Sequence, residues 1–488
     1  MDHGYRFKLW SSKAARRLIW ILAMAFAAVF LVQFFKLPYD HNVFTSLLSD
    51  AKVSFFGRTN YTNSARISNN QSSDLDSLSV PLKRNLTLGN SSYGTMGNSS
   101  YGTNLSLSHE ISEKIPAASI SQMDELLQES RTSLKSNPPL PSSAVDKELL
   151  YAKSEIESAP LVHSNSELYE PVYRNISKFK RSYELMEKML RVYIYKEGEK
   201  PIFHESILEG IYASEGWFLK MLESNKIYVT EDPKKAHLFY LPFSSRLLQL
   251  TLYVRSSHSR NNLIEFMKNY VEMLIQKYPF WNRTNGEDHF LAACHDWDVS
   301  LPTVYVRSAK NPLSDVGGES PAKRPILAFF AGYMHGNVRP TLLKYWGQDT
   351  DMKILGRMPH VKGNKNYIEH MKTSKYCICA RGYAVHSPRV VESILYECVP
   401  VIISDNYVPP FLEVLNWKSF AVFILEKDIP DLKKILLSIS EDKYLEMLKG
   451  VKEVQKHFLW HAEPVKYDLF QMILHSVWYN RVFRLKSV

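Results

Sequence analysis

The chain has 488 residues, which is enough for two or three domains with a sizeable core. Hydrophobic residues make up 45% and charged residues 23%, a composition that excludes global disorder. The formal net charge is +10, but the sequence lacks zinc-finger spacing, aromatic-basic recognition motifs and long basic runs, which argues against nucleic acid. A small, nucleotide-activated substrate is the anionic partner that fits better, and the alternative is that Lys and Arg simply outnumber acidic residues on a solvated surface.

The first predicted element is a membrane-spanning helix at residues 18–36. Leu18–Phe35 carries no charge and, at about 1.5 Å per residue, covers roughly 27 Å, the core of a thin bilayer. Five basic residues precede it, so the positive-inside rule places residues 1–17 in the cytosol. A cleaved signal peptide is the alternative, but its apolar region would be shorter and would end at small residues. We therefore predict an uncleaved signal anchor with the rest of the chain in the lumen.

Residues 37–165 are rich in Ser, Asn, Thr and Gly and are predicted to form a disordered, glycosylated stem. Short helices are compatible with 121–135 and 144–157. Six glycosylation sequons lie in this stem, at Asn60, Asn70, Asn85, Asn90, Asn98 and Asn104. Two more lie beyond it, at Asn175 and Asn282.

Strands and helices are predicted to alternate over 166–320 and again over 321–435. The first range has strands at 191–195, 226–230 and 236–242 and helices at 215–222 and 263–277. The second has strands at 326–331, 375–380, 399–404 and 420–425 and helices at 340–345 and 388–397. This alternation predicts an α/β fold with parallel sheets in two halves, and 436–488 is predicted to be helical.

Four cysteines are too few for a disulfide scaffold: Cys294, Cys377, Cys379 and Cys398. Cys377 and Cys379 alternate on a predicted strand and are expected to face the same side. Their spacing does not match a CxxC redox or zinc motif. Buried thiols are the favoured state, and one bridge in an oxidising lumen is the alternative.

The strongest chemical motif runs from Cys379 to Glu392, where a buried strand is followed by a Gly-containing loop and a helix. Ser387 suits the N-cap of that helix and Pro388 its first position. A helix start at the carboxyl edge of a parallel sheet suits a phosphate. Arg389 could bind that phosphate, and Glu392, three residues on, could accept hydrogen bonds from a ribose. The alternative is an ordinary capped helix with a surface ion pair.

Two weaker motifs accompany it. Phe329–Gly336 places glycines after a strand, where the backbone can turn tightly, and Arg339 follows. Residues 288–297 hold Asp288, His289, His295 and Asp296, and such Asp/His pairs could act as general bases or metal ligands. A hydrogen-bonded structural cluster is the alternative, and a metal-dependent hydrolase is a third, poorer interpretation because no HExxH motif is present.

Several stretches together resemble the exostosin-like glycosyltransferases, family 47, in their plant branch. The matching stretches are VYIYKEGEKPIFH, AHLFYLPFS, DHFLAACHDW, RPILAFFAGYMHG and KYCICARGYAVHSPRVVESILYECVPVIISDNYVPPF. The resemblance implies a GT-B fold, in which two Rossmann-like domains, here 166–320 and 321–435, face each other across a cleft. It also implies a single-pass type II Golgi membrane protein that transfers a sugar from a UDP-sugar, with inversion, to a cell-wall polysaccharide or glycan. No obligatory metal cofactor is implied, and other Golgi glycosyltransferases are conceivable partners.

Carried over residue by residue, the resemblance implies two sets of site residues. The implied donor-binding residues are Gly332, Arg339, Arg381, Gly382, Ser387, Pro388, Arg389 and Glu392. The implied candidates for the catalytic base are Asp288, His289 and Asp296.

One departure from the family concerns the residues after Trp297. The family has roughly thirty residues between the HDW motif and the DVSLP segment, whereas here Trp297 runs directly into Asp298. We expect the missing piece to come from the first Rossmann-like half. The alternative is therefore that the chain is a catalytically impaired variant, which binds glycans or a partner transferase in the Golgi.

Overall fold

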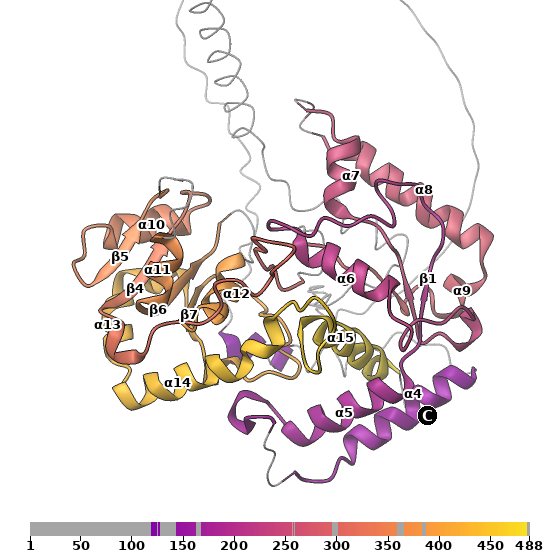
Figure 1. Ribbon diagram of the computed structural model, residues 1–488, viewed down its shortest axis with the longest axis horizontal. Coiled ribbons are helices and arrows are strands. Elements are labelled where there is room, and N and C mark those ends of the chain that lie inside the picture. The colour runs from indigo at the N-terminus through magenta and orange to yellow at the C-terminus, as the bar shows by residue number, and fades with distance from the viewer. Residues whose placement is uncertain are drawn as a thin grey trace, which may run out of the picture. The chain divides into compact units, whose positions relative to one another are not determined.

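The folded part of the chain contains two parallel β-sheets (Figure 1). The computed structural model describes residues 119–123, 125–126, 143–162, 167–255, 257, 259–294, 301–358, 366–382 and 387–485. The prediction of an α/β fold with parallel sheets is confirmed.

The first sheet has three short parallel strands in the order β1-β2-β3. The strands are β1 (Val192–Ile194), β2 (Leu238–Tyr240) and β3 (His289–Phe290). The helices of this half are α6 (Ala213–Glu223), α7 (Ser245–Leu252), α8 (Asn261–Lys277) and α9 (Phe280–Thr284). The strand predicted at 226–230 is wrong, because Val229 makes a single isolated bridge to Val192 and the residues before it form turns.

The second sheet has five parallel strands in the order β5-β4-β6-β7-β8. The strands are β4 (Ile326–Ala331), β5 (Met352–Leu355), β6 (Ser374–Ala380), β7 (Val399–Ile403) and β8 (Val422–Ile424). The helices of this half are α10 (Val338–Trp346), α11 (Asn366–Lys372), α12 (Pro388–Leu395), α13 (Leu432–Leu437) and α14 (Glu441–Val454). All of β7 and nearly all of β6 is buried, which explains their continuous apolar sequence. The strand order reverses between β4 and β6, and ligands of open α/β sheets bind outside the carboxyl ends at such a switch point.

Three helices from distant parts of the sequence lie side by side: α4 (Ala144–Glu157), α5 (Ile176–Met189) and α15 (Leu469–Arg484) (Figure 1). Leu149, Ala152 and Ile156 of α4 are fully buried in this contact. The Asp146 carboxylate, which also completes the capping box of α4, accepts a hydrogen bond from the buried Arg481 guanidinium at 3.1 Å. The predicted stem therefore ends too late at residue 165, because its helix at 144–157 buries an apolar face in the folded part.

The last helix also joins the first half of the chain to the C-terminal end. Phe470 of α15 packs against Phe218 of α6, and Gln471 accepts a hydrogen bond from the Tyr228 hydroxyl at 2.8 Å. One hydrophobic core contains residues of both sheets and of α15. The predicted helical character of 436–488 is confirmed for α14 and α15.

The predicted membrane anchor, the six stem sequons and Asp296 lie outside the described residues. Among the helices that the structure describes, none combines the length and apolar character needed to cross a bilayer.

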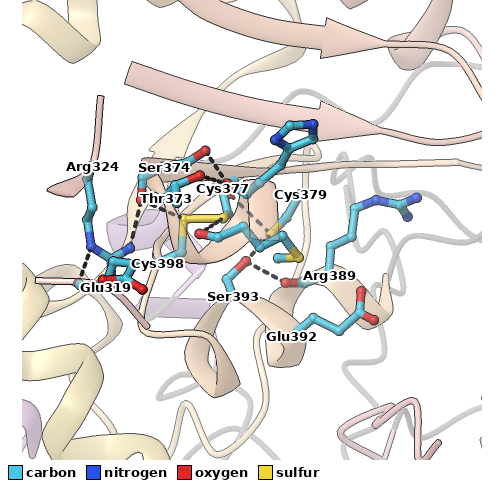
Figure 2. Close-up of a disulfide and its surroundings, with 12 residues drawn as sticks. Glu319, Arg324, Thr373, Ser374, Cys377, Cys379, Arg389, Glu392, Ser393 and Cys398 are labelled. Carbon is cyan, nitrogen blue, oxygen red and sulfur yellow. Dashed lines mark hydrogen bonds between the residues drawn. A yellow bond between two sulfur atoms is a disulfide. The ribbon is translucent and has the colours of Figure 1, made fainter. Parts of the chain in front are cut away.

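A disulfide joins Cys377 of β6 to Cys398 at the start of β7 (Figure 2). The favoured expectation of buried thiols is wrong for this pair, because neighbouring strands bring the two side chains together with 5.7 Å between their Cα atoms. Cys294 and Cys379 are buried free thiols, as expected.

Candidate functional site

Two arginines cross over at the switch point of the second sheet. Arg389, on the helix that follows β6, donates through Nε and Nη2 to the Ala331 carbonyl at the end of β4, at 3.2 and 2.7 Å. Arg339, on the helix that follows β4, donates through Nε to the Ala380 carbonyl at the end of β6, at 3.2 Å. Each guanidinium is thus fixed at the carboxyl edge where the fold places a ligand.

Two of the predicted glycines make room for these arginines. A Cβ atom on Gly332 would lie 2.5 Å from Nη2 of Arg389, and one on Gly382 would lie 2.8 Å from Nη2 of Arg339. The sequence motif indicated close approach of the backbone to a ligand. In the structure both glycines lie directly against the groups that would bind that ligand.

The crossing concentrates positive charge. Both guanidinium groups lie over the Phe330 ring, 5.8 Å from its centroid for Arg339 and 5.1 Å for Arg389. Burial, together with the charge of Arg389, lowers the pKa of Arg339 to about 10. Burial and the same two arginines also lower the pKa of His335. Within the described ranges neither Arg339 nor Arg389 forms an ion pair with a carboxylate, so an anion would relieve their mutual repulsion.

Helix α12 begins at this edge as its sequence predicts. The Ser387 hydroxyl accepts a hydrogen bond from the Arg389 N–H at 3.4 Å, and Pro388 occupies the first helical position. Arg389 and Glu392 project from the same helix beside the disulfide (Figure 2). Glu392 is largely buried and accepts a hydrogen bond from the Tyr367 hydroxyl of α11 at 2.9 Å.

Arg381 makes different contacts from Arg339 and Arg389. Its guanidinium forms an ion pair with Glu426 at 3.2 Å. The Glu426 carboxylate also accepts from the Asp405 N–H at 3.2 Å, and the Glu426 N–H donates to the Asp405 carboxylate at 2.9 Å. Arg381 therefore anchors the loop after β7, and its predicted contact with a donor stays a prediction.

Asp288 and His289 are internal structural groups, so the prediction that either is the catalytic base does not fit the structure. The Asp288 carboxylate accepts hydrogen bonds from Arg283 at 2.6 Å, Thr284 at 2.6 Å and His289 Nδ1 at 2.8 Å. Nε2 of His289 lies 2.7 Å from the Tyr195 hydroxyl, within hydrogen-bond distance. Neither side chain reaches solvent, so neither can take a proton from an acceptor sugar.

We expect Asp288→Asn to act on stability first. Asp288 is buried and its pKa is held below the ordinary range because the hydrogen bond from His289 and the charge of Arg283 outweigh the effect of burial. Removing the charge leaves Arg283 unpaired and should lower the free energy of unfolding by about 3 kcal/mol. Chemical denaturation measures this loss. A variant of wild-type stability that has lost sugar transfer would instead return Asp288 to the catalytic candidates.

Glu215 was not among the predicted site residues, yet it holds together the carboxyl edge of the first sheet. Its fully buried carboxylate accepts hydrogen bonds from the hydroxyls of Ser244 and Ser245, each at 2.6 Å. It also accepts from the backbone N–H groups of Arg246 and Cys294, at 3.1 and 3.2 Å. The carboxylate thereby ties the start of α7 to the end of the β3 segment. A lone acidic residue in an early helical turn gave no sequence signal for this role.

In the same half of the chain, His204 and Glu223 form a hydrogen-bonded pair, with 2.7 Å between Nδ1 and Oε1. The carboxylate raises the pKa of His204 above its ordinary value of about 6.5, against the effect of burial. Nε2 of His204 is buried and lacks a hydrogen-bond partner among the described residues. The pair is suited to stabilising the fold while the imidazole is protonated.

This geometry predicts a pH-dependent stability. Because the pKa of His204 is raised in the folded state, its pairing with Glu223 contributes fully to the free energy of unfolding below about pH 6.5. That contribution is lost as the pH rises through the folded-state pKa. We expect the difference in unfolding free energy between wild type and His204→Gln to be larger at pH 6 than at pH 9. Glu223→Gln should show the same trend, and a difference independent of pH would contradict it.

The two sequons that fall within the described residues are both on the surface. Asn175 is exposed at the N-cap of α5, where its side-chain oxygen accepts from the Lys178 N–H at 2.9 Å. Asn282 is exposed on α9, although the threonine of its sequon, Thr284, is buried against Asp288. Exposure is what a glycan requires, and glycosylation at both sites stays a prediction. No group of three or more His, Cys, Asp or Glu side chains in the described segments could hold a metal ion.

The parallel sheets and the paired arginines define an α/β protein with two neighbouring guanidinium groups at the switch point of its second sheet. The Exostosin GT47 domain family model matches residues 186–311 and 298–439. The chain therefore belongs to the exostosin family 47 of glycosyltransferases, and the resemblance read from the sequence is confirmed.

Curated relatives agree with this assignment. The Arabidopsis thaliana protein "Probable glycosyltransferase At5g03795" is 41% identical over 345 residues, covering 64% of this chain and 66% of its own length. "Probable glycosyltransferase At3g07620" from the same plant is 39% identical over 382 residues, covering 69% and 80%. More distantly, the "Probable glucuronosyltransferase Os01g0926600" of Oryza sativa subsp. japonica is 26% identical over 345 residues, covering 59% and 81%. Among solved structures, the crystal structure of TarM aligns with a TM-score of 0.28 and 11% identity, over 63% of this chain and 58% of that one.

Proposed function

We propose that this protein transfers a sugar from a UDP-sugar, with inversion, to a cell-wall polysaccharide or glycan. The observation that carries the proposal is the crossing of Arg339 and Arg389 at the switch point, where both guanidinium groups lack a carboxylate partner among the described residues. A diphosphate supplies the negative charge that such a pair lacks. Glu392, on the same helix, would accept hydrogen bonds from the ribose.

The proposed chemistry needs a positive group at the leaving oxygen and a base at the acceptor. The acceptor hydroxyl attacks the anomeric carbon in line while the bond from that carbon to the diphosphate oxygen breaks. The electron pair stays on the diphosphate, where Arg339, Arg389 and the first N–H groups of α12 would stabilise it. The hydroxyl proton passes to a base. Of the three predicted candidates Asp296 alone stays open, and it lies outside the described residues.

The proposal also includes the arrangement of the two halves and the cellular location. We infer that the two parallel sheets form a GT-B enzyme, and the return of α15 to α6 supports this because it ties the C-terminal end to the first half. We also infer a single-pass type II protein of the Golgi membrane, anchored by residues 18–36. Protease treatment of intact vesicles tests the topology: digestion of the C-terminal part without detergent would contradict it.

A thermal-shift screen of nucleotides on the purified full-length chain tests donor binding. At a concentration one hundred times its Kd, UDP should stabilise the folded state by about 2.7 kcal/mol. GDP and CMP serve as base controls, and release of UDP from UDP-sugars with plant glycans then tests transfer. Addition of a chelator tests the predicted metal independence. A folded sample that responds to none of the nucleotides would overturn the proposal.

A non-catalytic glycan- or partner-binding protein is the second candidate. Two observations favour it: among the described residues the first sheet has strands of three, three and two residues, and the family model matches in two overlapping pieces, 186–311 and 298–439. Inserting the corresponding thirty-residue segment of a relative should then raise soluble yield and create transfer activity. Sugar transfer by the unaltered chain would eliminate this candidate.

A further inference from the structure

Arg307 brings a residue from the first half of the chain to Glu392. Its Nη2 lies 3.4 Å from Oε1 of Glu392, and its Nη1 donates to the Tyr396 hydroxyl at 2.7 Å. The guanidinium also lies over two aromatic rings, 5.0 Å from the centroid of Tyr305 and 5.9 Å from that of Tyr396. Two hydrogen bonds and two ring faces fix a planar group in one orientation.

The segment that carries Arg307 is fastened to the first half. Its neighbour Val306 forms an antiparallel bridge with Gly210, with N–H to O distances of 2.8 and 3.3 Å. Further back, the buried Ser214 hydroxyl of α6 donates to the Pro302 carbonyl at 2.9 Å and accepts from the Val304 N–H at 3.3 Å. The backbone next to Arg307 is therefore held by Gly210 and α6 of the first half, while its side chain contacts Glu392 and Tyr396 of the second half.

The partners of Glu392 divide its carboxylate between them. Arg307 contacts Oε1, whereas the Tyr367 hydroxyl donates to Oε2. An ionised carboxylate can accept about four hydrogen bonds, so about one acceptor position on each oxygen is left. Two neighbouring acceptor positions on a fixed carboxylate match the two adjacent hydroxyls of a ribose.

We propose that Arg307 is a positioning residue for the nucleotide donor: it orients Glu392 toward the ribose hydroxyls and so makes donor recognition depend on the first half of the chain. The proposal rests on the proposed function, because Glu392 is its assumed ribose contact. It adds a residue from outside the predicted donor set. A purely structural tie between the halves would use the same contacts but would not distinguish one nucleotide sugar ring from another.

Comparing UDP with 2′-deoxy-UDP separates these two roles. By calorimetry the wild-type chain should bind UDP at least tenfold more tightly, since a hydrogen bond from a hydroxyl to a carboxylate is lost in the deoxy compound. In Arg307→Gln the ratio of UDP affinity to 2′-deoxy-UDP affinity should fall to a third of the wild-type ratio or less. Glu392→Gln should show a similar fall. Arg181→Gln, which removes a half-buried arginine paired with Glu155, is the matched control and should keep the wild-type ratio.

Each outcome decides between the proposals. Weaker binding of both nucleotides by the same factor in Arg307→Gln would overturn the positioning role and leave a structural one. If the preference for UDP over 2′-deoxy-UDP is unchanged in Arg307→Gln but lost in Glu392→Gln, the positioning role is overturned as well. The proposed function is not affected by that result. Failure of the wild-type chain to bind UDP would refute the proposed function itself. If Arg307→Gln does not fold, Arg307→Lys retains the charge but cannot donate to Tyr396 and Glu392 together, so an undiminished ratio in that variant would also refute the positioning role.

Discussion

Arg389→Gln is expected to reduce strongly the thermal protection that UDP gives the wild-type chain. The guanidinium occupies the carboxyl edge of β4 with no carboxylate partner in the described part of the chain, and each charge-assisted hydrogen bond to a phosphate contributes about 1.5–3 kcal/mol. Losing one such bond weakens UDP binding by roughly tenfold to 150-fold. Calorimetry below the unfolding temperature measures the affinity directly, and Arg339→Gln should behave in the same way.

Arg324→Gln is the matched control for this prediction. Arg324 is also a buried arginine of the second sheet, and its guanidinium donates to the Ser374 and Glu319 carbonyls, each at 2.8 Å (Figure 2). Ser374 begins β6, so these contacts lie at the end of the strand opposite to the proposed site. Arg324→Gln should lower stability and keep UDP affinity. A folded Arg389→Gln chain with wild-type affinity for UDP would show that the diphosphate binds elsewhere.

Removing the disulfide should cost both stability and donor affinity. Cys377 and Cys398 are 21 residues apart, and the loop between them contains Gly382, Arg389 and Glu392. Closing a loop of this length stabilises a folded chain by about 3 kcal/mol, chiefly by restricting the unfolded state. We expect Cys377→Ala/Cys398→Ala to lose that amount in chemical denaturation. UDP affinity should fall as well, because the bridge fixes the distance between β6 and the end of α12.

Reduction provides an independent check of this prediction. Dithiothreitol should lower the Tm of the wild-type chain toward that of the double variant and leave the double variant unchanged. Cys379→Ala is the matched control, since Cys379 lies on the same strand, is equally buried and forms no bridge. A wild-type Tm that does not respond to reductant, with free thiols confirmed by labelling, would contradict the prediction.

Patterns within single segments carried most of the fold prediction. The run ILAFFA predicts β4 with both its ends, and KYCICA predicts β6 with a one-residue error, because strands buried on both faces are apolar throughout. The Ser387-Pro388 pair predicts the start of α12, since a cap and a proline have local requirements. The segment 226–230 has the same strand-like composition, but no neighbouring strand completes its ladder beyond one bridge.

The site was predictable to a smaller extent. Arg339, Arg389 and Glu392 could be found from the sequence, because each is a charged residue that follows the carboxyl end of a predicted strand. Glu215 and Arg307 could not be found in this way, since their partners lie 29 and 85 residues away in the sequence. Asp288 and His289 misled the prediction: a cluster of Asp and His can equally be solvent-accessible or internal, and only packing distinguishes the two.

The sequence by itself determined the family, through the stretches that resemble it, and also the α/β class and the helix start at Ser387, which follow from local composition and spacing. Tertiary structure alone decided which charges are paired. It buried Asp288 under Arg283, tied Arg381 to Glu426, closed the Cys377–Cys398 bridge and left Arg339 and Arg389 crossed without a described carboxylate partner. The physical reason is that an ionisable group acts according to its partners and its burial, and both are set by residues distant in sequence.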